Sequence, residues 1–216
     1  MTFKVVIFDW DGTVVDSVEH ITDSLQQAAA DLGFDPLARA AYRDIIGLGM
    51  VEALNTLYPG IQKSDMMALR DRYGHYFFQQ LTTPQQVFAG MNDLLADLRH
   101  AGVGRAVATG KSRRGLDAAL QSSGLGSLFE VTRCADETRS KPDPLMLEQI
   151  LSHYRLAPDE VVMVGDTVYD LDMAARIGMP SVGVEWGVHD REALHQHKPH
   201  AVVNTVDDLR RALGLS

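Results

Sequence analysis

Short apolar runs alternate with amphipathic helical patterns along much of the chain. The first and fourth of these runs are continuous and rich in Val and Ile, which is typical of strands buried on both faces of a parallel sheet. In chain order, the expected strands are Lys4–Phe8, Arg105–Ala108, Phe129–Cys134, Val161–Val164, Ser181–Val184 and Ala201–Val203.

Helical patterns lie between most of these runs. Met91, Leu94 and Leu98 recur at helical spacing, and Gly102 follows as a residue that commonly ends a helix. Further along, Asp143 and Pro144 have the order of an N-cap and a first helical residue. Because strands and helices alternate from about Gly90 onward, the pattern predicts βαβ units in an α/β fold with a doubly wound parallel sheet.

Residues 17–84 interrupt this alternation with helical patterns and no convincing strand. The first helix is followed by Gly33 and Pro36, and further helical patterns cover Leu37–Ile46, Met50–Leu57 and Asp65–Leu81. One face of the first helix carries Ile21, Leu25, Ala28, Ala29 and Leu32. The sequence therefore predicts a helical lobe of residues 17–84 inserted into an α/β core made of residues 1–16 and 85–216.

The composition restricts the binding partners and the cellular compartment that we expect. The chain has 216 residues and a formal net charge of −9, so we expect it to be repelled by nucleic acid. A single cysteine, Cys134, excludes an internal disulfide. No apolar run approaches the roughly 20 residues of a membrane-spanning helix, and the N-terminus lacks the pattern of a signal peptide. We therefore expect a cytoplasmic protein without a membrane partner.

Polar residues stand where three of the expected strands end. Asp9 and Asp11 follow the first strand, Thr109 follows the second, and Asp166 follows the fourth, with Asp170 one helical turn later. In a doubly wound sheet, ligands bind at the carboxyl ends of the strands. These side chains are therefore expected at one edge of the sheet.

The chemistry of these residues points to a cation and a phosphate. Several carboxylates at close range stay ionised only near a cation, and such oxygen ligands suit Mg²⁺ together with a substrate phosphate. Lys141, in a segment with two prolines, adds a positive charge, and Thr109 adds a hydroxyl. The combination predicts a magnesium-dependent phosphoryl site.

Each residue also has a purely structural explanation. An aspartate after a strand is often a helix N-cap, which is the alternative for Asp166. A lysine such as Lys141 is usually solvated. The placement of all of them at the ends of separate strands favours a site over these alternatives.

The residues resemble a known family. Asp9–Ser17, with the sequence Asp-Trp-Asp-Gly-Thr-Val-Val-Asp-Ser, looks like the first motif of haloacid dehalogenase-like phosphohydrolases. Thr109 matches the second motif, Lys141 the third, and Gly165–Thr167 with Asp170 the fourth. The helical insert falls where this family has a small α-helical cap. Within the family, the sequence is most similar to the phosphoglycolate phosphatase-like branch.

The resemblance implies a role for each acid. Asp9 would be the nucleophile that forms an aspartyl-phosphate, and Asp11 would act as general acid and then as general base. Asp9, the backbone carbonyl of Asp11 and Asp166 would bind Mg²⁺. Asp170 would support the metal directly or through water.

The resemblance also implies which groups hold the phosphate. Thr109, Lys141 and the Gly110 amide would bind the phosphoryl oxygens. Asp11 favours phosphate chemistry, because the true dehalogenases of this superfamily lack the second acid of the first motif. Trp10 stands where the family is expected to have an aliphatic residue, and we expect its side chain to point away from the metal.

Substrate choice is expected to lie in the cap, which closes over the site in such enzymes. By resemblance, Gly47–Gly49 would be a specificity loop. Arg43 could bind a substrate carboxylate, as phosphoglycolate would require, with a solvated helix arginine as the alternative. His20, near the hinge, is expected to pack or lie at the surface.

The resemblance thus implies a Mg²⁺-dependent phosphatase that acts on a small phosphorylated metabolite, with a phosphoglycolate-like substrate. A sugar-phosphate mutase or phosphatase, or a nucleotide or pyrophosphate hydrolase, would share the same core residues. A phospho-aspartate signalling module and a non-catalytic binding module are alternatives of a different class. We expect a monomer or a weak homodimer.

Overall fold

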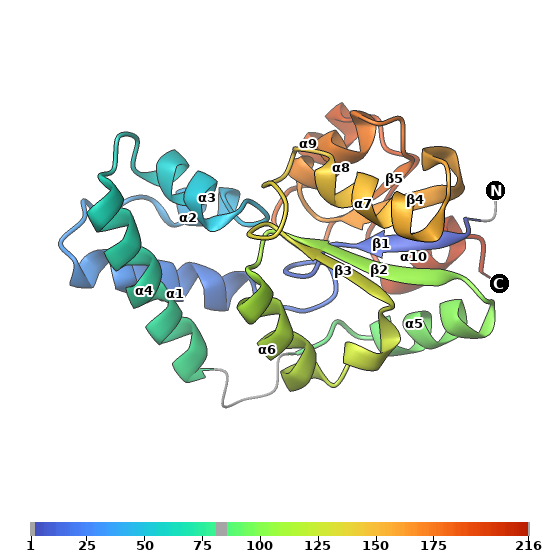
Figure 1. Ribbon diagram of the computed structural model, residues 1–216, viewed down its shortest axis with the longest axis horizontal. Helices are drawn as coiled ribbons and strands as arrows, with labels where there is room; N and C mark the ends of the chain where they lie inside the picture. The colour runs from blue at the N-terminus through green and yellow to red at the C-terminus, as the bar shows by residue number, and fades with distance from the viewer. Residues whose placement is uncertain (1–2, 81–85, 216) are drawn as a thin grey trace.

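Six parallel strands form one sheet in the computed structural model, which describes residues 3–80 and 86–215 (Figure 1). Each strand coincides with one of the expected runs. The strands are β1 (Val5–Phe8), β2 (Gly104–Thr109), β3 (Val131–Cys134), β4 (Val161–Gly165), β5 (Ser181–Val184) and β6 (Ala201–Val203). The α/β fold with a parallel sheet is confirmed.

The strand order is β3-β2-β1-β4-β5-β6. The chain first builds outward from β1 through β2 to β3 and then returns to place β4 on the other side of β1. In register, Phe8 lies between Val107 of β2 and Val164 of β4. The order therefore reverses at β1 and β4, and ligands bind at such a switch point, beyond the carboxyl ends of the strands.

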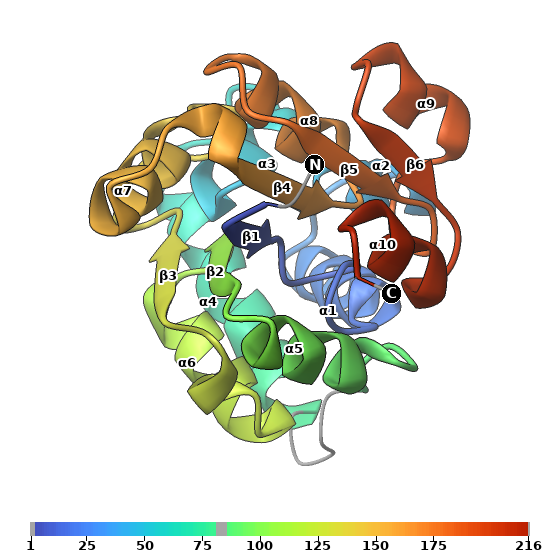
Figure 2. The same cartoon turned by 90° about the vertical axis from the view of Figure 1, so that its right-hand side faces the viewer.

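Helices cover both faces of the sheet, which explains the continuous apolar runs (Figure 2). Val6 and Phe8 of β1 belong to one hydrophobic cluster, and Val5 and Ile7 belong to another on the opposite face. The first cluster includes residues of α5 (Met91–His100), α6 (Arg113–Ser123) and α10 (Val206–Ala212). The second includes residues of α7 (Leu145–Tyr154) and α8 (Val168–Ala175). The remaining core elements are η1 (Gly126–Leu128), η2 (Pro158–Glu160) and α9 (Arg191–Gln196).

The helix signals in the core were accurate to about one residue. Gly102 follows the end of α5 with a φ of 71°, a left-handed conformation that glycine adopts without strain. Helix α7 begins at Leu145, and Pro144 is its N-cap. The prediction that Asp143 is the N-cap was wrong by one position, but its carboxylate still accepts a hydrogen bond of 3.1 Å from the Leu145 amide.

Of the five described helices between β1 and β2, the first four form a separate group, which we call the cap helices (Figure 1). They are α1 (Val18–Asp31), α2 (Arg39–Asp44), α3 (Met50–Leu57) and α4 (Lys63–Gln80). Their apolar residues form a hydrophobic cluster of their own. Leu32, expected on the buried face of the first helix, is instead 39% exposed, because α1 ends at Asp31.

The chain enters and leaves the cap helices along two adjacent segments. Val15 pairs with Val87 in an antiparallel bridge, and the Asp16 amide donates a 2.8 Å hydrogen bond to the carbonyl of Gln86. The expected boundary at residues 84 and 85, like Leu81, lies outside the described residues. The division into a core and a cap at residues 17–84 stays a prediction.

Within residues 3–80 and 86–215, none of the helices is both long enough and apolar enough to cross a membrane.

Candidate active site

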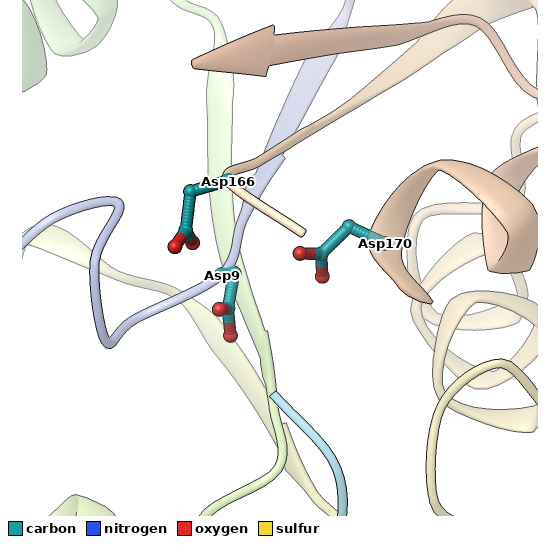
Figure 3. A group of neighbouring side chains, drawn as sticks. All are labelled: Asp9, Asp166 and Asp170. Atoms are coloured by element: carbon teal, nitrogen blue, oxygen red, sulfur yellow. The ribbon is translucent and has the colours of Figure 1, made fainter. Parts of the chain in front are cut away.

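Three aspartates meet where β1 and β4 end (Figure 3). Asp9 follows β1 and Asp166 follows β4, while Asp170 lies in the first turn of α8. All three are at most 1% exposed, and each offers an oxygen within 4.8 Å of those of the other two. The sheet therefore brings together the three acids that the sequence placed at separate positions.

Lys141 reaches the same cluster from the segment before α7. Its ammonium lies 2.6 Å from Oδ1 of Asp9 and 2.6 Å from Oδ1 of Asp170, and its side chain is fully buried. The alternative of a solvated lysine is thereby excluded for Lys141.

Burial sets the electrostatics of the cluster. It raises the pKa of Asp9 well above its ordinary value, with Lys141 opposing the shift and Asp170 adding to it. Burial, reinforced by the charge of Asp170, raises the pKa of Asp166 to about 7. Burial alone would lower the pKa of Lys141, but the charges of Asp170 and Asp9 outweigh it and raise that pKa. One ammonium thus faces three buried carboxylates.

The cluster suits a hard cation. Oδ2 of Asp9 is a buried oxygen that accepts no hydrogen bond from the described residues, and a buried acceptor without a donor is costly. Oxygen donors with excess negative charge are the set that a divalent cation such as Mg²⁺ prefers. The charge of the cluster and the free Oδ2 of Asp9 therefore fit such an ion.

Asp166 is held in place by the core. Its Oδ1 accepts a 2.7 Å hydrogen bond from the Thr13 hydroxyl, and its Oδ2 accepts a 2.8 Å hydrogen bond from the Val188 amide. A side chain at Gly12, which has a φ of 77°, would collide with this carboxylate. The N-cap of α8 is Thr167, so Asp166 does not serve as the cap that we considered as an alternative.

Asp170 does have a structural role beside its place in the cluster. Its Oδ2 accepts hydrogen bonds from the amide and the hydroxyl of Thr167, at 3.2 and 2.7 Å. The two residues form a capping box at the start of α8. This fixes the direction of Oδ1, which faces Lys141.

Asp11 has different neighbours. Its Oδ1 accepts a 2.6 Å hydrogen bond from the Ser17 hydroxyl and lies 3.0 Å from the ammonium of Lys111. Trp10, between the two acids of the motif, is fully buried and makes an edge contact with Phe129 at 5.9 Å. Trp10 therefore packs into the hydrophobic core.

Thr109 and Gly110 end β2 next to β1. Thr109 is buried, and its hydroxyl accepts a 3.2 Å hydrogen bond from the Lys111 amide. A Cβ at Gly110 would lie 2.5 Å from the carbonyl oxygens of Gly47 and Leu48. The absence of a side chain at Gly110 thus lets a cap loop approach the core backbone closely.

The loop Gly47–Gly49 lies at the junction of the cap helices and the core. The Gly49 amide donates a 2.7 Å hydrogen bond to the hydroxyl of Ser140, next to Lys141 in sequence. The Tyr169 hydroxyl donates a 2.8 Å hydrogen bond to the carbonyl of Asp44. The loop suspected of controlling specificity therefore borders the segments that carry the site.

Arg43 lies on the surface of the cap helices. Its guanidinium is 3.3 Å from Oε1 of Glu19, and its side chain is 37% exposed. A role for Arg43 in binding substrate stays a prediction, and its described ion pair is with a neighbouring cap helix.

Comparison with known proteins places this arrangement in a family. A family model described as "Haloacid dehalogenase-like hydrolase" matches residues 6–184. The chain belongs to this family. The match spans β1 to β5 and so includes all the residues of the carboxylate cluster.

Individual relatives of this haloacid dehalogenase-like hydrolase cover nearly its whole length. A protein of Dickeya dadantii named "Probable phosphatase IndB" is 34% identical over 95% of this chain and 91% of its own. A phosphoglycolate phosphatase of Synechococcus elongatus is 30% identical, with 97% of both chains covered. The solved structure of a hydrolase from Pseudomonas syringae has a TM-score of 0.89 at 22% identity, with 98% of both chains covered, and it supports the fold. Among its relatives, the chain lies in the phosphoglycolate phosphatase-like branch.

Several contacts in the site of this hydrolase were not anticipated. Thr13 and Ser17 orient Asp166 and Asp11, although both lie inside the first motif. Lys111 stands beside the second motif, and its position at a strand end was the available signal. The Val188 amide could not be found from the sequence, since any residue carries an amide.

Proposed function

We propose that the protein is a Mg²⁺-dependent phosphatase that hydrolyses a small phosphomonoester through an aspartyl-phosphate at Asp9. The observation that supports this most is the state of Asp9. Its carboxylate is buried at the switch point of the sheet, with one oxygen paired to Lys141 and the other accepting no hydrogen bond from the residues that the structure describes. A carboxylate held in this way can approach a phosphorus atom without first losing a hydrogen bond from that free oxygen.

In the first step, a carboxylate oxygen of Asp9 forms a bond to phosphorus while the bond from phosphorus to the ester oxygen breaks. Asp11 donates its proton to the leaving alkoxide, which departs as an alcohol. The hydrogen bond from Ser17 and the ion pair with Lys111 fix the direction of the Asp11 carboxylate. Asp11 is therefore held in a defined orientation for this transfer.

In the second step, a water molecule attacks the phosphorus of the aspartyl-phosphate, and Asp11 accepts the proton of that water. The bond between phosphorus and the Asp9 oxygen breaks, which releases inorganic phosphate and restores the Asp9 carboxylate. Asp11 has regained its proton for the next cycle. Each atom and proton is accounted for by these two residues, the ester and one water.

Positive charge and hydrogen-bond donors would hold the transferring group. Lys141, the Thr109 hydroxyl and the Gly110 amide would bind the phosphoryl oxygens. Asp9, Asp166, Asp170 and the backbone carbonyl of Asp11 would hold Mg²⁺. When bound, Mg²⁺ would supply charge that offsets the repulsion between the Asp9 carboxylate and a dianionic phosphate.

The substrate class we propose is phosphoglycolate or a similarly small metabolite. A relative named phosphoglycolate phosphatase covers 97% of this chain, which supports the class. The cap, proposed to comprise residues 17–84, would select the substrate through the loop Gly47–Gly49, which already borders Gly110 and Ser140.

A panel of phosphometabolites, assayed for phosphate release with Mg²⁺, tests the proposal. We expect turnover with a preference for phosphoglycolate, and loss of turnover when a chelator removes the metal. A protein that accepts phosphate from a small donor but holds it without turnover would instead be a signalling module. Conversion of one sugar phosphate into another without phosphate release would indicate a mutase.

A further inference from the structure

A second buried lysine lies at the edge of the site, toward the cap helices. Lys111 follows Gly110, and its side chain is 7% exposed. Its ammonium lies 3.0 Å from Oδ1 of Asp11 and 4.6 Å from the centre of the Phe77 ring on α4. This core lysine therefore has a charged partner in the core and an aromatic partner in the cap helices.

The two lysines of the site differ in the number of their described ion-pair partners. Lys141 bridges two carboxylates at 2.6 Å and is fully buried, so its charge is used inside the cluster. The described ion pair of Lys111 is with Asp11 alone. Because an ammonium has three donor hydrogens, Lys111 retains the capacity to bind a further acceptor.

Cap residues form a wall beside Lys111. The His20 ring stacks on Phe77 at 4.6 Å with an interplanar angle of 8°, which holds Phe77 in position. Tyr73 adjoins Phe77 at 5.5 Å, and burial together with the charge of Asp11 raises the pKa of Tyr73. Tyr73 therefore lies within electrostatic reach of Asp11, on the same side as Lys111.

The place of Lys111 defines which part of a substrate it would meet. Asp11 is the proposed proton donor to the ester oxygen, so a cation 3.0 Å from Asp11 lies beside the leaving group. An anion bound there belongs to the leaving alcohol and is separated from the ester oxygen by only one or two carbons. In the proposed mechanism, the transferring phosphoryl group is held at Asp9 and Lys141 instead.

We propose that Lys111 is a specificity residue that binds the carboxylate of the small phosphomonoester proposed above. This inference rests on the proposed function and names its substrate determinant. It differs from the sequence-based hypothesis for Arg43, whose guanidinium pairs with Glu19 at the surface of the cap helices.

Binding to a catalytically inactive background tests the inference without turnover. In an Asp9→Asn protein with Mg²⁺, calorimetry compares phosphoglycolate with ethyl phosphate, in which a methyl group replaces the carboxylate. Adding Lys111→Met is expected to weaken phosphoglycolate binding by about 10- to 100-fold, the worth of a charge-assisted hydrogen bond. Ethyl phosphate is expected to lose much less, and Lys111→Arg is expected to retain most of the preference.

A matched control is Lys4→Met, at the opposite end of β1, where the lysine is 62% exposed and pairs with Glu160. This variant is expected to leave the ratio of the two affinities unchanged. Equal losses for both ligands in Lys111→Met would overturn the inference. If Arg43→Met loses the preference for phosphoglycolate while Lys111→Met keeps the preference of the Asp9→Asn protein, Arg43 binds the carboxylate instead.

Turnover separates this inference from the proposed function. Phosphate release from an aryl phosphate by the unmodified protein tests the phosphatase mechanism alone. If that release occurs while the binding preference does not depend on Lys111, only the lysine assignment fails. If no phosphomonoester is hydrolysed, the proposed function fails, and the calorimetric ratio still decides whether Lys111 binds the carboxylate.

Discussion

The floor of the site and its rim hold charge in contrasting ways. The floor consists of Asp9, Lys141, Asp166 and Asp170, and the rim consists of Asp11, Lys111 and Phe77. At the floor, one fully buried ammonium is shared between Asp9 and Asp170, and both of these described partners belong to the core. At the rim, Lys111 pairs with a single aspartate and contacts an aromatic ring of the cap helices.

This difference suggests separate roles for the two regions, one in phosphoryl binding and the other in the choice of substrate. Under the proposed function, the floor would bind the phosphoryl group, which all phosphomonoesters share. The rim, which joins the core and the cap helices, would meet the rest of the substrate. Changes at the floor should therefore affect every substrate, whereas changes at the rim should affect the choice among substrates.

The largest effect is expected from Asp9→Asn at the floor. An amide cannot form the acyl phosphate, so phosphate release from an aryl phosphate with Mg²⁺ should fall on the order of 10⁵-fold, as for other nucleophile deletions. Circular dichroism should show that the fold persists. Full activity in this variant would refute the proposed mechanism. It would also contradict the proposed difference between the floor and the rim.

Removal of each lysine charge compares the two regions directly. Lys141→Met leaves two buried carboxylates without their counter-charge, so the free energy of unfolding should fall by about 3–5 kcal/mol in the metal-free protein. Lys111→Met removes the counter-charge of a single buried carboxylate, in a pair whose side chains are 7% and 9% exposed, and should cost less, about 2–3 kcal/mol. Urea unfolding measures both, and equal losses would show that floor and rim do not differ in this way.

The stability of the folded protein is expected to depend on pH through Asp166 at the floor. Asp166 has a pKa of about 7 in the folded protein, against an ordinary value of 3.8, so the folded state holds a proton that the unfolded chain releases. The resulting stabilisation, of about 4 kcal/mol at most, is complete below pH 3.8 and is lost as the pH rises through about 7.

Urea unfolding of the metal-free protein at pH 5 and pH 8 checks this sign. Stability should fall toward pH 8, and the fall should be smaller in Asp166→Asn. Saturating Mg²⁺ should reduce the dependence, because a bound cation favours the charged carboxylate. The same pH dependence in both proteins would show that Asp166 titrates normally.

The smallest effects are expected at two glycines with positive φ. Gly12→Ala and Gly33→Ala introduce similar backbone strain, at φ of 77° and 72°, worth about 1–2 kcal/mol each. Only Gly12 lies against Asp166, whereas a Cβ at Gly33 meets nothing within 4 Å. Gly12→Ala should also weaken Mg²⁺ binding by about 10- to 100-fold. Calorimetry measures the Mg²⁺ affinity of both variants. Equal affinities would show that the close contact between Gly12 and Asp166 does not affect metal binding.

The floor could be predicted largely from the sequence, and the rim could not. Asp9 and Asp166 each follow an apolar run, and the carboxyl ends of parallel strands lie at one edge, so a local pattern is enough to bring them together. The contact between Lys111 and Phe77 joins residues 34 positions apart, one just after β2 and the other on α4 of the cap helices. No periodicity in either segment indicates which side chains face each other across such a junction.

Arg43 and Leu32 illustrate the same limit within the cap helices. The residue type of Arg43 suits a carboxylate, but the helix α2 turns it toward Glu19. Leu32 continues an apolar face, yet it lies just beyond the end of α1 and is partly exposed. Helix ends and the rotation of short helices depend on packing partners that a single sequence does not reveal.

Trapping of the aspartyl-phosphate tests directly whether Asp9 is the nucleophile. The protein is mixed with phosphoglycolate labelled with ³²P in the presence of Mg²⁺, quenched in acid within milliseconds, and digested for peptide mapping. The account predicts transient label on the peptide that contains Asp9, removable by hydroxylamine and absent in Asp9→Asn. Phosphate release with label on no aspartate, or on an aspartate other than Asp9, would contradict it.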